Sequence, residues 1–143
     1  MIEIDGSHKS GSGTIVRDAV SLATLTGQEL RLTNIRARRD KPGLRPQHLK
    51  GIEACSQICQ GKLEGAKVGA REIRFKPGEK ISGGDFDIGT AGSTTMLVSI
   101  LLPVALFAKG ASTYRITGGL FQDFAPSAYH LKYVLFPILK QMA

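Results

Sequence analysis

The sequence opens with MIEIDGSHKSGSGTIVRDAVSLATLTG, residues 1–27. Its first five residues favour a short strand, and residues 6–13 are rich in glycine and serine. Apolar residues then recur at helical spacing from 15 to 25, until Gly27 ends the pattern. The stretch therefore predicts a strand, a glycine loop and a helix. Free backbone N–H groups and the helix dipole favour binding of an anion at such a loop.

The alternation of strands and helices continues beyond this opening. The expected elements are a strand at 29–35, a basic loop at 36–45, a helix from Pro46 to about Gln60, and short strands at 63–68 and 72–75. Together with the opening strand and helix, they give the order βαβαββ.

After a turn-rich segment, the order of elements starts again. The second set contains a strand at 85–88, a helix at 93–108, a strand at 112–117 and a helix at 126–142. We therefore expect an α/β fold with one βαβαββ unit over 1–80 and a truncated βαβα unit over 81–143. Because the second unit lacks a closing pair of strands, we expect the chain to form a homo-oligomer or to bind a companion half.

The charge balance indicates an anionic partner. The 143 residues include 19 Lys and Arg against 12 Asp and Glu, a formal net charge of +7. Such an excess attracts polyanions through electrostatics and counterion release. A basic surface without a specific partner has the same composition. Whether the charges cluster at one place in the sequence distinguishes the two interpretations.

Compartment and metal content follow from the cysteines and the apolar segments. Cys55 and Cys59 lie one helical turn apart, a spacing that suits buried packing better than a disulfide or a zinc site. The N-terminus lacks the pattern of a signal peptide, and the longest apolar run, 96–108, is too short to cross a bilayer. We therefore expect a cytoplasmic protein with no metal and no membrane partner.

The glycine loop, residues 6–13, is the first candidate site. It is neither a Walker loop nor a dinucleotide fingerprint. His8 and Lys9 lie within it, and Arg17 lies one turn into the following helix, from where it can reach back toward an anion. A plain capped turn is the alternative interpretation.

The arginine loop, residues 36–45, is the second candidate and lies within IRARRDKPGLRPQHL at 35–49. Its cations are Arg36, Arg38, Arg39, Lys41 and Arg45. Guanidinium groups suit bidentate binding of phosphate, and a solvated loop seldom concentrates four of them, so we favour contact with a ligand. Gln47 and His48 follow at the start of the helix and can point the same way. A lone histidine is more often structural than catalytic.

The third candidate is DIGTAGSTT at 87–95, again at a turn between a strand and a helix. Ser93, Thr94 and Thr95 place hydroxyl groups beside free N–H groups. Serine and threonine also cap helices generally, and this helix is strongly apolar, so simple capping is the favoured interpretation.

Several of these segments resemble the RNA 3'-terminal phosphate cyclase family. The matching motifs are IDGS at 4–7, IRARRDKPGLRPQHL at 35–49, EGAKVG at 64–69, DIGTAGST at 87–94, LLPVALFA at 101–108 and ITGG at 116–119. The match runs along the whole chain, and PGLRPQHL is its most specific part. An enolpyruvyl-transferase type of enzyme also has repeated βαβαββ units and anion-binding arginines, but this segment favours the cyclases.

The resemblance implies repeated units similar to the C-terminal domain of translation initiation factor three. It implies ATP-dependent conversion of an RNA 3'-phosphate into a 2',3'-cyclic phosphate, with ATP and Mg²⁺ as cofactors and RNA bearing a 3'-phosphate as partner. In the family, a histidine in the far C-terminal part carries AMP, and this sequence ends before that part. His8 and His130 match no family motif, and His48 matches the QH motif.

The resemblance also assigns site residues. The positions associated with RNA and phosphate binding are Arg17, Arg36, Arg39, Gln47 and His48, and those associated with the nucleotide are Gly11, Gly13 and Pro126. The glycine loop departs from the family's GEGGGQ, because Ser10 and Thr14 replace a glutamate and a glutamine near nucleotide and metal. Leu120 and Phe121 stand where the family has a Thr-Asp pair. A cyclase and a non-catalytic RNA-binding relative therefore both remain open.

Overall fold

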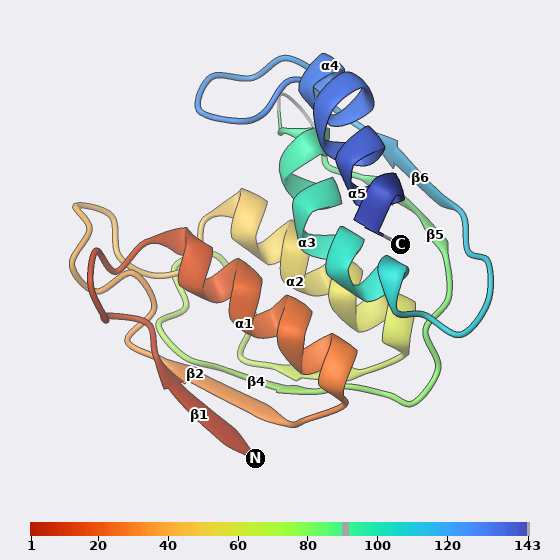
Figure 1. Cartoon of the computed structure of the whole chain (residues 1–143). Coiled ribbons are helices and arrows are strands. Elements are labelled where there is room, and N and C mark those ends of the chain that lie inside the picture. The colour runs from red at the N-terminus through yellow and green to blue at the C-terminus, as the bar shows by residue number, and fades with distance from the viewer. Residues whose placement is uncertain (90–91, 143) are drawn as a thin grey trace.

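The computed structural model describes residues 1–89 and 92–142. It has the mixed α and β content that the sequence predicts, with helices layered on sheets (Figure 1). Two separate sheets are present among the described residues, one of four strands and one of two.

The four-stranded sheet and two helices form the first part of the fold. Its elements are β1 (Ile2–Asp5), α1 (Gly13–Thr26), β2 (Leu30–Thr33), α2 (Pro46–Cys59), β3 (Lys62–Glu64) and β4 (Ile73–Lys76). The strand order is β1-β2-β4-β3, in which β1 and β2 are parallel and β4 is antiparallel to both β2 and β3. Residues alternate between faces: Leu30 and Leu32 are buried under the helices, and so are Ile73 and Phe75.

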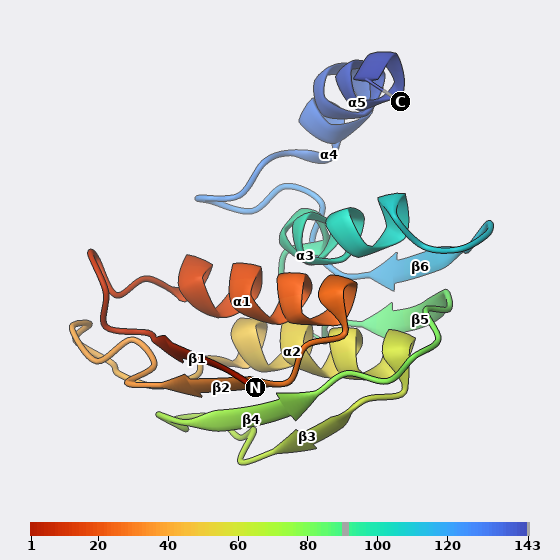
Figure 2. The ribbon, with the colours of Figure 1, turned by 60° about the horizontal axis from the view of Figure 1, so that its bottom comes forward.

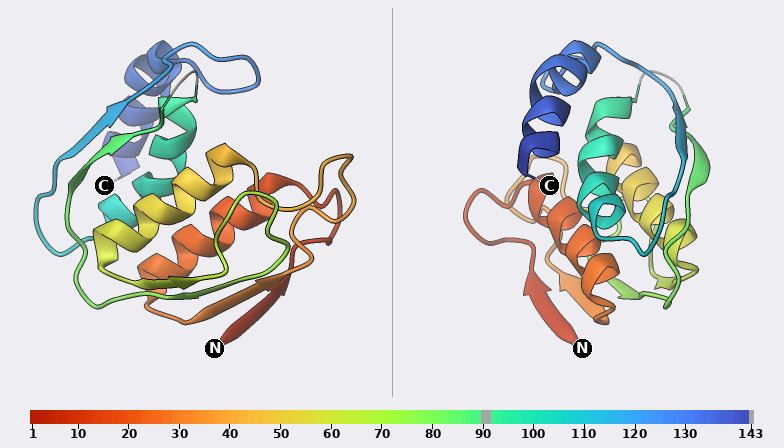
Figure 3. Two further views of the ribbon diagram at one scale, coloured as in Figure 1. Left: turned by 180° about the vertical axis from the view of Figure 1, so that it is seen from behind. Right: turned by 45° about the vertical axis from the view of Figure 1, so that its right-hand side comes forward.

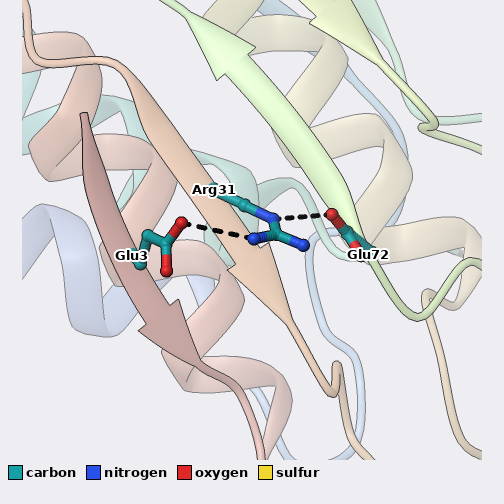
Figure 4. Close-up of polar contacts among 3 residues, drawn as sticks. All are labelled: Glu3, Arg31 and Glu72. Carbon is teal, nitrogen blue, oxygen red and sulfur yellow. Dashed lines mark hydrogen bonds and ion pairs between the residues drawn. The ribbon is translucent and has the colours of Figure 1, made fainter.

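The opposite face of this sheet is charged. Arg31 lies between two carboxylates, with Nη1 3.3 Å from Glu3 Oε1 and Nε 2.8 Å from Glu72 Oε1 (Figure 4). Figure 2 shows α1 and α2 on the other side of the sheet only. Such exposed ion pairs contribute little to stability, so the helix-covered face supplies the core.

The second part is a parallel strand pair joined by a helix. It contains β5 (Gly84–Asp87), α3 (Thr94–Leu106) and β6 (Tyr114–Thr117), with Phe86 opposite Ile116. Helix α3 packs against both earlier helices. The hydroxyl of Ser21 on α1 donates to the carbonyl of Ile100 at 2.6 Å, and Gly51 on α2 faces the side chain of Ile100. The three helices therefore share one core.

The last helical segment consists of α4 (Ala128–His130), a π-helical turn η1 (Leu131–Leu135) and α5 (Phe136–Met142). One helix was expected from residue 126, and it begins two residues later, where the Ser127 hydroxyl accepts from the N–H of His130 at 3.1 Å. Pro137 has no N–H to donate to the carbonyl four residues earlier, which accounts for a break in the α-helical register nearby. Figure 2 shows this segment apart from α1 and α2, and Figure 3 shows it beside α3 from two further sides.

Other predictions from the sequence have clear outcomes. The strand expected at 63–68 ends at Glu64, because residues 65–70 form a loop that hydrogen-bonds to the arginine loop. Cys55 and Cys59 are buried free thiols, which confirms the packing interpretation. In the part of the chain described, no helix has the length and apolar character needed to cross a membrane.

Candidate functional site

The arginine loop, the start of α2 and the residues before α3 surround a depression in the surface, whereas the glycine loop lines a different cavity of about 440 Å³. An open groove of about 450 Å³ is lined by Arg36, Arg45, Pro46, Gln47, Ile88 and Gly92. A smaller pocket of about 20 Å³, room for one water molecule, contains Arg17, Gln47, Lys50 and Ser93 in its wall. Gln47 and Ile88 line both spaces, so the groove and the pocket adjoin each other.

The arginine loop holds its shape through the guanidinium of Arg36. Arg36 Nη1 donates to the carbonyl of Lys41 at 2.6 Å and to that of Gly43 at 3.0 Å. Both bonds use the same terminal nitrogen, so the other guanidinium nitrogens are not needed to hold the loop. The backbone of Arg36 has a φ of +52°, and the two bonds hold the residue in that conformation. The loop is therefore ordered before any ligand arrives.

Residues 65–70 support the arginine loop from behind. The N–H of Leu44 donates to the carbonyl of Ala70 at 2.9 Å, and the N–H of Gly69 donates to the carbonyl of Leu44 at 2.8 Å. Gly43 has a φ of +79°, and a Cβ there would lie 2.2 Å from the carbonyl oxygen of Gly69. Glycine at 43 is thus required both by backbone conformation and by this close approach.

The cations of the site lie close to one another. Burial lowers the pKa of Arg36, and the neighbouring charges of Arg45 and Arg39 lower it further. The ion pairs found within the described residues involve none of these three side chains. A cluster of guanidinium groups without a carboxylate partner is stabilised when an anion enters the groove.

His48 lies beneath this cluster. Its side chain is 3% exposed, and its Nδ1 accepts a hydrogen bond from the backbone N–H of Arg45 at 3.1 Å. Burial lowers its pKa to about 4, helped by the positive charges of Arg36, Arg17 and Arg45. The imidazole is therefore neutral near pH 7.

The glycine loop borders the same region. The hydroxyl of Ser12 caps α1 by accepting from the N–H of Thr14 at 3.3 Å, and Arg17 Nη2 donates to Thr14 Oγ1 at 3.0 Å. Gly11 is buried beside Arg38, whose Nη1 donates to the carbonyl of Lys9 at 3.1 Å. The two loops are thus joined through Arg38.

The sequence-predicted residues fall into two groups. Arg17 lines the pocket, Arg36 lines the groove and Gln47 lines both. Gly13 touches the buried His48, and Arg39 lies close enough to Arg36 to lower its pKa. Pro126 is exposed ahead of α4 and lines none of the cavities formed by the described residues.

The third candidate segment is a helix start. Ser93 caps α3, since its hydroxyl accepts from the N–H of Met96 at 3.2 Å, as the capping interpretation predicted. Thr90 and Ala91 of that segment lie outside the described residues. Ser93 nevertheless lines the pocket together with Arg17.

One cation of the depression was not a candidate from the sequence. It is Lys50, which lines the pocket, whereas Arg45, a cation of the arginine loop, lines the groove as the residue that precedes α2. Lys50 follows Gln47 by three residues, so the helical period places both on one face of α2. That spacing is the signal that could have identified Lys50 from the sequence.

The described residues offer few ligands for the magnesium that the resemblance implies. Among residues 1–89 and 92–142, no three His, Cys, Asp or Glu side chains lie close enough to hold a metal ion. Asp5, the carboxylate nearest the loop in sequence, accepts from the N–H of Ser7 at 2.8 Å, and Ser10 stands where the family has a glutamate. These donors do not fit the magnesium that the resemblance implies, so we assign no step to it.

Comparison with known proteins identifies the relatives of this chain. The family model described as RNA 3'-terminal phosphate cyclase matches residues 8–143. Curated proteins named RNA 3'-terminal phosphate cyclase are 47% identical over 133 residues in Pyrococcus furiosus, 48% over 144 in Archaeoglobus fulgidus and 45% over 144 in Methanosarcina barkeri.

These alignments cover 92%, 99% and 99% of this chain but only 39%, 44% and 43% of the three relatives. The chain thus spans about two fifths of their length. The match to the family model nevertheless covers nearly every residue, including the arginine loop and the helix starts. The chain belongs to the RNA 3'-terminal phosphate cyclase family.

Proposed function

We propose that this chain binds the 3'-phosphate end of an RNA in the groove between the arginine loop and the start of α3. The observation that carries this proposal is the convergence of Arg36, Arg45 and Gln47 on one open groove, with Arg17 in the adjoining pocket. Guanidinium forks bind phosphate oxygens in a bidentate manner, and a terminal phosphate carries more charge than an internal one.

The open shape of the groove supports binding of a chain end rather than of a buried small molecule. About 450 Å³ is enough for a phosphate with part of its ribose, and the groove is open to solvent on one side. The RNA chain can therefore continue outward. The net charge of +7 adds a general attraction for the rest of the polyanion.

Within the whole protein, we propose that this binding presents the phosphate for ATP-dependent cyclisation to a 2',3'-cyclic phosphate. The names of the relatives support this activity. ATP would supply the activating group when bound, and this chain's own residues would hold and orient the RNA end. The buried free thiols of Cys55 and Cys59 favour a reducing compartment such as the cytoplasm.

A second candidate is a non-catalytic RNA-binding relative. Ser10 and Thr14 favour it, because they replace the glutamate and glutamine of the family's glycine loop. This candidate keeps the phosphate-binding groove and loses the chemistry. If the whole protein bound RNA but did not become adenylylated by ATP, this second candidate would be favoured over the cyclase.

Binding of RNA is tested by titrating the chain with oligonucleotides that end in a 3'-phosphate or a 3'-hydroxyl, at several salt concentrations. We expect about tenfold tighter binding of the 3'-phosphate. In Arg36→Ala/Arg39→Ala this preference should disappear, and the slope of log affinity against log salt should flatten by about 1.4, since roughly 0.7 is lost per phosphate contact to a single strand.

The matched control removes two positive charges elsewhere. Arg74 lies on the exposed face of the four-stranded sheet, and Arg115 is an exposed residue of β6. Arg74→Ala/Arg115→Ala should keep the preference for the 3'-phosphate. Equal affinity of the unaltered chain for both ends, or the same loss in both double variants, would refute binding at this groove.

We further propose that residues 1–80 and 81–143 are two copies of one unit similar to the C-terminal domain of translation initiation factor three. In the first unit, the parallel pair β1 and β2 is extended by the antiparallel strands β4 and β3. The parallel pair β5 and β6 has no third strand among the described residues. A hairpin from the rest of the protein, or from a companion chain, would pair with the free edge of β6.

The last helical segment supports the same proposal. Exposed apolar side chains lie along it, including Tyr133 at 63%, Val134 at 44% and Ile138 at 49%, while Leu131 is buried at 5%. In the first unit, the corresponding helix α2 buries its apolar face against the sheet and α1. Additional strands would give α5 the surface that α2 already has.

A further inference from the structure

His48 lies where the starts of α1 and α2 meet. One ring nitrogen, Nδ1, accepts the N–H of Arg45, the residue before α2. The other, Nε2, faces Gly13, the first residue of α1: a Cβ placed on Gly13 would lie 2.0 Å from Nε2 and under 3 Å from both adjacent ring carbons. The imidazole therefore lies between the two helix starts and contacts both.

The bond to Arg45 places His48 in a defined role at the start of α2. His48 is the third residue of the helix, and a glutamate or glutamine at that position commonly accepts from the N–H of the residue before the helix. Because Nδ1 accepts, the neutral ring carries its proton on Nε2, on the side of Gly13. The ring is held in one tautomer and one orientation.

Burial separates His48 from the residues that line the groove. Its side chain is 3% exposed, whereas Gln47 beside it is exposed and contributes to both the groove and the pocket. Arg36 and Gln47 line the groove and His48 does not, so a phosphate bound there would contact the first two residues and not the imidazole. His48 therefore acts on the ligand through the two loops that it separates.

We infer that His48 is a positioning residue whose ring sets the distance between the starts of α1 and α2, and thereby between the glycine loop and the arginine loop. This inference rests on the proposed binding of an RNA 3'-phosphate and adds a role for two residues of that site. Gly13 is the other half of the contact, because any side chain there would displace the ring and separate the loops.

The contact itself is tested without RNA by a double-mutant cycle on the full chain. We expect Gly13→Ala to lower the midpoint of thermal unfolding by about 5 °C when His48 is present, and by much less in the background of His48→Ala, where the methyl group has room. Additive losses in the two backgrounds would show that the ring does not press on Gly13 and would overturn the inference.

The positioning role is tested with His48→Gln, which keeps an acceptor for the Arg45 N–H but removes the ring. We expect it to unfold near the temperature of the unaltered chain and to bind 3'-phosphate RNA about tenfold more weakly, with unchanged affinity for 3'-hydroxyl RNA. Gly13→Ala should show the same selective loss. Retention of full 3'-phosphate affinity by both variants would overturn the positioning role.

Failure of the proposed function has a different signature. In that case the unaltered chain binds both RNA ends equally, while the unfolding cycle still reports whether the ring and Gly13 are coupled. A coupled cycle with no preference for the 3'-phosphate would refute RNA-end binding and the positioning role together, but it would leave the contact between His48 and Gly13 established.

Discussion

At the scale of single residues, the surroundings of His48 change its pKa. The buried imidazole is surrounded by Arg36, Arg17 and Arg45, and burial together with these charges lowers its pKa to about 4. A histidine that remains neutral in a cluster of arginines adds no further repulsion, so the cations can stay close together for an anion.

This perturbed pKa predicts how stability depends on pH. The folded pKa of His48 lies below its ordinary value of 6.5, so the unfolded chain takes up the proton first as the pH falls. Stability should therefore decrease as the pH is lowered from about 6.5 to about 4, by about 3 kcal/mol at most. Urea unfolding at a series of pH values measures this change.

The matched control for that series is His48→Gln, which cannot titrate and should lose this part of the pH dependence. His8 and His130 are exposed and remain in both proteins. An equally steep decrease of stability in His48→Gln would mean that carboxylates, not this imidazole, cause the dependence on pH.

At the scale of elements, the contact between α1 and α3 joins the two parts of the fold. Ser21 on α1 is 3% exposed, and its hydroxyl donates to the carbonyl of Ile100 on α3 at 2.6 Å. Because Met96, Leu97 and Ile100 of α3 line the pocket, this bond also holds one wall of the pocket against α1.

Ser21→Ala removes that bond, and we expect it to lower the free energy of unfolding by about 1 kcal/mol, the usual net contribution of one hydrogen bond. Chemical unfolding measures the loss. Ser10→Ala, at an exposed position of the glycine loop, serves as the control and should change stability by less than about 0.5 kcal/mol. Equal effects of the two substitutions would contradict a stabilising role for the contact.

At the scale of the whole molecule, the exposed last helix predicts association. Tyr133 and Ile138 expose 63% and 49% of their surface, and Phe121, Tyr129 and Tyr133 form a row of neighbouring rings, with centroid separations of 5.2 and 6.0 Å. We expect sedimentation velocity over a hundredfold range of concentration to show self-association of the isolated chain, because burial of this surface is favourable.

Ile138→Lys should shift that equilibrium toward the monomer. Leu22→Lys is the matched control, since Leu22 is similarly exposed, at 54%, but lies on α1. A sharp, concentration-independent monomer with cooperative unfolding would contradict the expectation of an unfinished second unit.

The sequence by itself determined the order of the elements and the likeness to the cyclases. Helical and strand periods are local patterns, and so are the helix boundaries at Gly27, Pro46 and Ser93. They can therefore be recognised without knowledge of tertiary contacts. The strand expected to run to residue 68 ends at Glu64, because the chain beyond it forms a loop in which Gly69 and Ala70 bond to Leu44 of the arginine loop.

Only the tertiary structure decided how the site is built. It brought Arg17, Gln47 and Ser93 from three helices to one pocket, left Pro126 outside the cavities of the described residues, and buried His48 against Gly13. The physical reason is that burial and closeness between distant segments depend on how α1, α2 and α3 pack. No periodicity within one segment carries that information.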